Sequence, residues 1–222
     1  MKIIEKALKQ GRNMLSEYES KQILSAYQIP VVNELLAESI EDLLMAVSKI
    51  GYPLVLKGCS PEIAHKTEKG LIRMDIRDED EAKSAFDEIF SSMDGSGNAV
   101  LVQEMIKGKR ELVAGMTRDP QFGPCVMFGL GGIFTEILKD ISFRVAPLEK
   151  RDAMDMMHEI KSSRILEAVR GMEAADMDMM TQLLINTGRI GLENERIREI
   201  DINPVIISGS KPVVVDALII LE

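Results

Sequence analysis

The sequence has little of what a nucleic-acid-binding surface requires. It contains no Trp, and aromatic residues make up only 4% of the chain. Acidic residues outnumber basic ones by 36 to 27, so the formal net charge is -9, and no basic tract is present. Because nucleic-acid surfaces combine basic patches with stacking aromatic rings, we expect no nucleic acid among its partners.

Membrane and disulfide signals are equally scarce. No apolar run approaches the roughly 18–20 residues that cross a bilayer, and the first ten residues lack the apolar core of a secretory signal. The two cysteines, Cys59 and Cys125, have neither metal-site spacing nor the density of a disulfide framework. We therefore expect a cytoplasmic protein with no membrane attachment. With 222 residues, 45% of them hydrophobic, it can bury one core or two small ones.

Helices and strands are expected to alternate in the first half of the chain. The apolar spacing and turn signals predict helices at 15–27, 39–51 and 80–90, and strands at 30–36, 53–57, 71–76 and 99–105. After residue 110 the pattern predicts short strands at 111–116, 126–128, 133–138 and 143–147, then helices at 150–161 and 175–191.

This change of pattern predicts two lobes. We expect an N-terminal arm at 1–14, a first lobe at 15–107 and a second lobe at 108–222. A polar loop, 58–70, is inserted in the first lobe. The fold class is α+β.

Polar residues recur at alternate positions in two aliphatic strands near the C-terminus. Asp201 and Asn203 are two residues apart in a strand and therefore point to one face. A hairpin turn at Gly209 and Ser210 places Asn203 opposite Asp216, with Cβ atoms about 4.5–5.5 Å apart. Three oxygen ligands of this kind suit Mg²⁺. The alternative is a strand whose polar side only faces solvent.

Two candidate residues for binding or transferring phosphate lie at the end of the strand at 53–57 and in the loop after it. Lys57 is expected to end that strand and is suited to bind nucleotide phosphates, or else it only meets water. His65, one of two histidines, lies in the polar loop 58–70. A neutral imidazole can attack a phosphoryl group and pass it on. The alternative is a solvated loop histidine.

The expected lobe boundary offers groups for a nucleoside. The strand at 99–105 ends in Gln103 and Glu104, and its backbone can contact an adenine edge. Glu111, at the start of the next strand, can accept hydrogen bonds from ribose hydroxyls. A glycine-rich turn, 129–136, does not match the dinucleotide-binding pattern. It is either a close approach to a ligand or a simple hairpin turn.

Taken in order, these features resemble an ATP-grasp domain, in which two α/β lobes clamp a Mg-nucleotide. More narrowly, the chain resembles the ATP-grasp (β) subunit of ADP-forming acyl-CoA synthetases, relatives of succinyl-CoA synthetase. The motifs that carry the resemblance are LSEYESKQIL from Leu15, PLVLK from Pro53, IAHKT from Ile63, GLGGIFTE from Gly129, VRG from Val169 and EIDINP from Glu199.

The resemblance implies a role for each candidate residue. The nucleotide, ATP or ADP, would contact Lys57, Lys66, Gln103, Glu104, Ile106 and Glu111. His65 would carry the phosphoryl group as a phosphohistidine. Asn203 and Asp216 would bind Mg²⁺. Asp201 would either join the metal site or steady the phosphohistidine.

The implied reaction is acyl-CoA + ADP + phosphate ⇌ carboxylate + CoA + ATP. The chain has no glycine-rich helix start to receive CoA, so the resemblance implies a separate CoA-binding α subunit in an α2β2 assembly. Two alternatives remain open. One is an ATP-grasp carboxylate ligase that forms no phosphohistidine. The other is a non-catalytic, ATP-sensing regulatory module.

Overall fold

The computed structural model describes residues 1–60, 70–93, 98–132, 140–169 and 171–222. The chain divides into two compact units. Unit 1 contains residues 1–31 and 106–222, and unit 2 contains residues 32–105. The expected strand at 133–138 and most of the expected loop at 58–70, including His65 and Lys66, lie outside the described residues.

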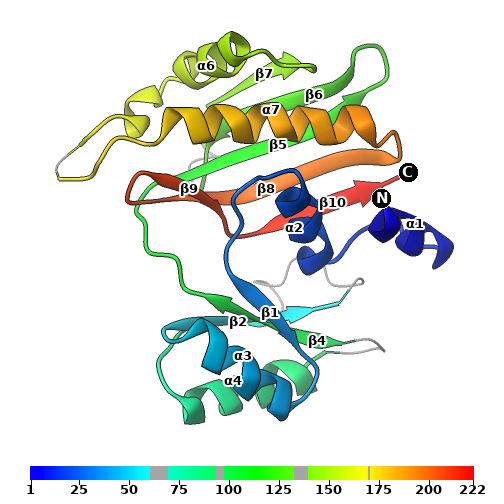
Figure 1. Cartoon of the computed structure of the whole chain (residues 1–222), viewed down its shortest axis with the longest axis vertical. Helices are drawn as coiled ribbons and strands as arrows, with labels where there is room; N and C mark the ends of the chain where they lie inside the picture. The colour runs from blue at the N-terminus through cyan, green and yellow to red at the C-terminus, as the bar shows by residue number, and fades with distance from the viewer. Residues whose placement is uncertain (61–69, 94–97, 133–139, 170) are drawn as a thin grey trace. The chain divides into compact units, whose positions relative to one another are not determined.

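Unit 2 is a four-stranded antiparallel sheet with two helices (Figure 1). The strands, in spatial order, are β1 (Glu34–Ala37), β4 (Ala99–Glu104), β2 (Leu54–Cys59) and β3 (Ile72–Ile76). Helices α3 (Ile40–Ile50) and α4 (Glu79–Ser91) pack on the sheet. They begin at the side-chain caps Ser39 and Asp78, which accept the otherwise unpaired N–H groups of the first turn.

The core of unit 2 follows the period-two pattern of its strands. Leu54 and Leu56 of β2 and Val100 and Val102 of β4 are fully buried against the helices. The residues between them therefore lie on the other face of the sheet. Strand β2 continues to Cys59, so the prediction that a loop begins at Gly58 is wrong.

Unit 1 is built on a larger antiparallel sheet. Its strands, in spatial order, are β10 (Ala217–Leu221), β8 (Ile197–Ser208), β5 (Glu111–Asp119), β6 (Gly123–Leu130) and β7 (Ile141–Val145), with β9 (Lys211–Val214) also paired to β8. Helices α2 (Glu17–Ala26), α6 (Lys150–Glu159) and α7 (Met177–Glu193) pack on these strands (Figure 1). A short 3₁₀ helix, Ser163–Leu166, follows α6.

The N-terminal segment belongs to unit 1, whereas the sequence analysis assigned residues from 15 onward to the first lobe. The N–H of Leu15 donates to the carbonyl of Ile219 at 3.0 Å, and the N–H of Leu221 donates to the carbonyl of Asn13 at 2.7 Å. Helix α2 then begins with a capping box formed by Ser16 and Glu19. Pairing with β10, distant in sequence, therefore decides the placement.

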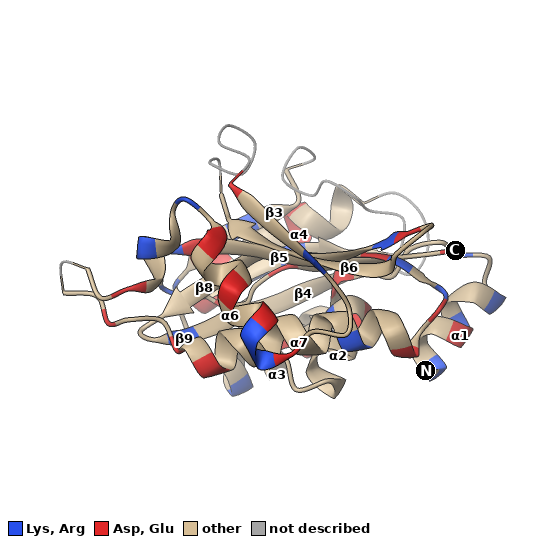
Figure 2. Cartoon of the chain, turned by 90° about the horizontal axis from the view of Figure 1, so that it is seen from above, with Lys and Arg blue, Asp and Glu red and all other residues tan. Residues whose placement is uncertain are grey.

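The predicted N-terminal arm is mostly helical. Residues Lys2–Lys9 form helix α1, whose Ile4 and Ala7 are buried in the core of unit 1. Acidic and basic side chains are interspersed along α1 and along α6 (Figure 2). Among the helices that the structure describes, none is both long and apolar enough to cross a bilayer.

A buried arginine forms a hydrogen bond to the turn between β8 and β9. Arg110 is only 4% exposed. Its guanidinium donates to the carbonyls of Gly209 at 2.9 Å, Ile165 at 3.2 Å and Glu167 at 3.4 Å. The planar fork of Arg can bond several acceptors at once, which a Lys ammonium on a flexible stem does less well. The turn and the segment after α6 are thus fixed by one side chain.

We predict that Arg110→Met destabilises the protein by about 2–4 kcal/mol, because buried carbonyls lose a charged donor. Thermal unfolding followed by circular dichroism measures the effect. Arg151→Met is the matched control, because the side chain of Arg151 is 88% exposed. Its change should stay within about 0.5 kcal/mol. Equal losses in the two variants would contradict a fastening role for Arg110.

Candidate functional site

Three polar residues of unit 1 share the face of the sheet that points away from its core. In β8, Ile200 and Ile202 are buried in the core, so the alternate residues Asp201 and Asn203 lie on the opposite face. Asp201 lies opposite Leu218 in the register of β8 and β10. Asp216, two residues before Leu218, comes just before β10 begins.

The predicted hairpin register is confirmed. The N–H of Asn203 donates to the carbonyl of Asp216 at 3.2 Å, so these residues are opposite one another. Strands β8 and β9 are joined by the two residues Gly209 and Ser210, and Gly209 has φ +61°. This left-handed conformation favours glycine and explains the turn signal in the sequence.

This face carries a partly buried acidic group. Burial, together with the nearby carboxylates of Glu199 and Asp216, raises the pKa of Asp201 to about 6. A divalent cation bound by Asp201, Asn203 and Asp216 would relieve this repulsion, and their oxygens are the hard donors that Mg²⁺ prefers. Within the described ranges, no three His, Cys, Asp or Glu residues are grouped closely enough to bind a metal by themselves.

Glu199 is a neighbour that the sequence analysis did not single out. It lies two residues before Asp201 and pairs with Thr117 and Ile220 in the sheet. The same period of two that places Asp201 and Asn203 on one face also places Glu199 there. The signal was therefore present in the sequence.

The glycine-rich turn packs on Glu111. The N–H of Gly131 donates to the carbonyl of Glu111 at 2.8 Å. A Cβ atom at Gly131 would lie 2.8 Å from the backbone of Glu111, and one at Gly132 would lie 2.8 Å from its carboxylate. The backbone contact excludes a side chain at Gly131, and the φ of +67° at Gly132 disfavours one there. The exposed carboxylate of Glu111 lies beside Gly132. Residues 133–136 of the turn are outside the described part of the chain.

In unit 2, two predicted nucleotide contacts share the sheet face away from the helices. Lys57 is 4% exposed and pairs with Leu101, and Gln103 is 1% exposed and pairs with Val55. Because Lys57 is inside β2 and buried, the alternative of a lysine in water is wrong. Lys57 and Gln103 are therefore diagonal neighbours on this face of the sheet.

The end of β4 is fixed by hydrogen bonds within unit 2. Glu104 accepts a bond from the N–H of Asn33 through its carboxylate at 2.8 Å, and its own N–H donates to the carbonyl of Asn33 at 3.0 Å. The N–H of Met105 donates to the carbonyl of Pro53 at 3.2 Å. Glu104 and Met105 therefore have no backbone N–H to spare for a ligand. Ile106, which follows, is half-buried.

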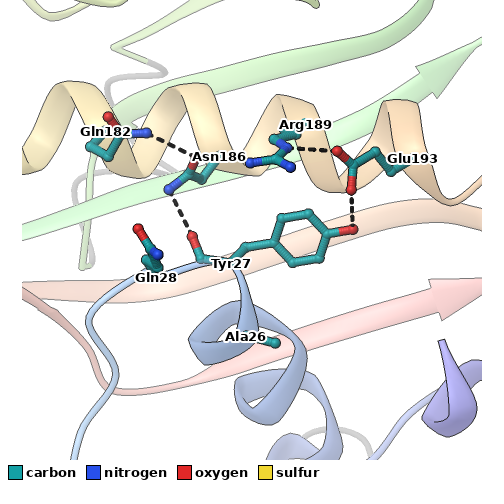
Figure 3. Close-up of a pocket in the computed structure, with 7 residues that line it drawn as sticks. All are labelled: Ala26, Tyr27, Gln28, Gln182, Asn186, Arg189 and Glu193. Carbon is teal, nitrogen blue, oxygen red and sulfur yellow. Dashed lines mark hydrogen bonds and ion pairs between the residues drawn. The ribbon is translucent and has the colours of Figure 1, made fainter.

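A separate pocket of about 270 Å³ lies between the end of α2 and the middle of α7 (Figure 3). The hydroxyl of Tyr27 donates to Glu193 at 2.8 Å, and Glu193 also accepts a bond from Arg189 at 2.6 Å. The side-chain amide of Asn186 donates to the carbonyl of Tyr27 at 2.7 Å. These groups already bond one another, so we interpret the pocket as a polar junction between the helices.

The fold, and the paired polar residues on the sheet face away from the core, are those expected of an ATP-grasp domain. The ATP-grasp domain family matches residues 6–221, and the chain belongs to this family. It is similar to the β subunit of the ADP-forming acetate–CoA ligase II of Pyrococcus furiosus. The two are 42% identical over 230 residues, which cover 100% of this chain and 98% of that subunit.

Solved structures give the same assignment. The chain is similar to the dinucleotide-forming acetyl-coenzyme A synthetase 1 of Ca. Korarchaeum cryptofilum in complex with coenzyme A and Ca-AMPCP, with 44% identity and a TM-score of 0.94. That similarity covers 100% of this chain and 99% of the solved chain. A second structure of that enzyme contains coenzyme A and Mg-AMPPCP, with its phosphohistidine segment pointing towards the nucleotide-binding site. Its identity is 44%, its TM-score is 0.88, and its coverage is again 100% and 99%.

We predict that Asp201→Asn stabilises the metal-free protein more at neutral than at acidic pH. Unfolding returns the pKa of Asp201 from about 6 to its ordinary 3.8. The folded state therefore binds the extra proton, and its stability falls as the pH rises through this interval. At about pH 7.5 the substitution should add about 1–2 kcal/mol, and at about pH 4 much less, after allowance for solvent screening.

Calorimetric unfolding at the two pH values, in EDTA, tests this expectation. Asp87→Asn is the control, because Asp87 is exposed on α4 and far from β8 in the sequence. It should leave the stability difference between the two pH values as in the wild type. A gain from Asp201→Asn that is the same at both pH values would rule out the raised pKa of Asp201.

Proposed function

We propose that this chain is the nucleotide-binding β subunit of an ADP-forming acyl-CoA synthetase, an acid–thiol ligase. Its reaction is acyl-CoA + ADP + phosphate ⇌ carboxylate + CoA + ATP. The observation that carries the proposal is the similarity to an acetate–CoA ligase β subunit over practically the full length of both chains. Asp201 and Asn203 of β8, with Asp216 before β10, supply the oxygen ligands that such a reaction needs for a Mg-nucleotide.

We assign Asn203 and Asp216 to Mg²⁺. They lie opposite one another on the sheet face away from the core, beside Asp201, whose pKa is raised by burial and by the nearby carboxylates of Glu199 and Asp216. Asp201 either completes this metal site or pairs with the phosphohistidine, and both roles need a carboxylate. When bound, the ion supplies charge neutralisation on the nucleotide phosphates.

We assign the contacts of the nucleotide residue by residue. Lys57 contacts a phosphate, because its buried ammonium lies on the helix-free face of its sheet. The segment from Gln103 to Ile106 contacts the adenine edge. Ile106 is the backbone donor, since the N–H groups of Glu104 and Met105 are engaged. Glu111, held beside Gly132, accepts bonds from the ribose hydroxyls.

We assign the phosphoryl relay to His65. An imidazole nitrogen attacks the phosphorus of an acyl phosphate, and the carboxylate leaves. A terminal oxygen of ADP then attacks the same phosphorus, the P–N bond breaks, and ATP forms with neutral His65 restored. The phosphohistidine segment of the Korarchaeum enzyme supports this assignment. Lys66, the next residue, is proposed as a phosphate contact during the transfer.

A partner subunit completes the enzyme. The Pyrococcus relative is a β subunit by name. We propose that a CoA-binding α subunit forms the acyl phosphate and that the assembly is α2β2. The acyl group would then be selected by the partner rather than by this chain.

We predict that incubation with Mg-ATP phosphorylates His65. Intact-protein mass spectrometry at alkaline pH, where phosphohistidine survives, should detect one added phosphoryl group, and addition of ADP should remove it. His65→Asn should gain none and should lose essentially all acyl-CoA synthetase activity with the α subunit, because no carrier remains. ATP binding by this variant should be retained.

His158→Asn is the control, because His158 is an exposed residue of α6 and is expected to leave phosphorylation unchanged. Full synthetase activity of His65→Asn would overturn the relay and favour a direct carboxylate ligase. Binding of Mg-ATP without phosphorylation, in the presence and absence of the α subunit, would favour a sensor.

A further inference from the structure

Two charged side chains are buried together beneath the strand that follows Asp216. Glu17 and Lys21 lie one turn apart on α2, and only 1% of each side chain is exposed. The Nζ atom of Lys21 lies 2.7 Å from a carboxylate oxygen of Glu17. Well-packed apolar residues would stabilise such a core at least as well as a buried ion pair. The pair therefore points to a role besides stability.

The second contact of Lys21 indicates that role. Its Nζ atom donates to the carbonyl of Val215 at 3.1 Å. Val215 lies between β9 and β10, outside both strands, and directly precedes Asp216. On its other side the N–H of Val215 donates to the carbonyl of Pro204 at 3.0 Å. The peptide before Asp216 is thus held by β8 and by a buried ammonium.

Neighbouring bonds attach the rest of this segment to the N-terminal region. The N–H of Val214 donates to the carbonyl of Pro30 at 2.8 Å, and the N–H of Ile219 donates to the hydroxyl of Ser20 at 3.1 Å. Helix α2 lies beside β10 (Figure 1). These bonds attach β9 and β10 to the N-terminal region on either side of residues 215 and 216, which are themselves bonded to β8 at Pro204 and Asn203.

We propose that Lys21, charged and oriented by Glu17, is a positioning residue that sets the Asp216 carboxylate for a divalent metal. It acts through the carbonyl of Val215 and does not itself contact the metal. The inference rests on the proposed metal role of Asp216. In metal sites, residues that orient the ligands without touching the metal commonly matter for affinity. Their substitution typically weakens metal binding by about 10- to 100-fold.

The test uses the full chain with ADP, and Mn²⁺ as the metal probe. Glu17→Leu combined with Lys21→Met removes both charges of the ion pair together, and the bond to Val215 is lost. Water-proton relaxation should show Mn²⁺–ADP binding weakened by about tenfold. Binding of ADP alone in EDTA, measured by calorimetry, should stay unchanged, because the altered residues do not touch the nucleotide.

Ile23→Val is the matched control, since Ile23 is fully buried on the same helix but makes no bond to the segment at 214–219. It should leave Mn²⁺–ADP binding unchanged. If the double variant does not fold, Glu17→Gln with Lys21→Gln replaces it. That neutral pair can still form a hydrogen bond, but glutamine is one atom shorter than lysine and falls short of the Val215 carbonyl.

The outcomes separate the two proposals. Selective weakening of Mn²⁺–ADP binding supports the positioning role. Unchanged Mn²⁺–ADP binding in a folded variant overturns it, as does an equal loss of ADP binding in EDTA. If the wild-type chain binds ADP but gains nothing from Mn²⁺, the metal site itself is wrong, and the positioning role fails with it.

Discussion

The register of β8 is the constraint on which the rest of unit 1 depends. This strand pairs with β5, β9 and β10, and its buried side chains include Ile200 and Ile202. A slip of one residue would turn these side chains outward and bring Asp201 into the apolar core. The free energy that fixes the register is therefore hydrophobic, and it outweighs the cost of holding the partly buried Asp201 carboxylate on the opposite face.

The sequence predicted those parts of the site that depend on residues close together in the chain, and it did not predict those that depend on contacts between distant residues. The alternation in EIDINP and the Gly-Ser turn are local, and they correctly placed Asn203 opposite Asp216. Lys21 and Arg110 gave no such signal, because their acceptors Val215 and Gly209 lie 194 and 99 positions away. A lysine in a helical pattern is normally expected in water. Only the tertiary fold shows that this one is buried.

Both units place their candidate residues in the same manner. Helices cover one face of each sheet, and the predicted ligand contacts Lys57 and Gln103 in unit 2, and Asp201 in unit 1, lie on the other face. Side chains on paired strands are held more precisely than side chains on loops. The groups proposed to bind charge are thus positioned by strand pairing.

The pairing of residues 13–15 with β10 has a consequence for how the chain is made. Unit 2 is one continuous segment, 32–105. All of its residues are present once residue 105 has left the ribosome, so it can fold during synthesis. Unit 1 uses both ends of the chain, because Asn13 and Leu15 bond Leu221 and Ile219. Its first two helices are therefore synthesised well before their partner strand β10. The core of unit 1 can close only after β10 has been synthesised, long after unit 2 is complete in sequence.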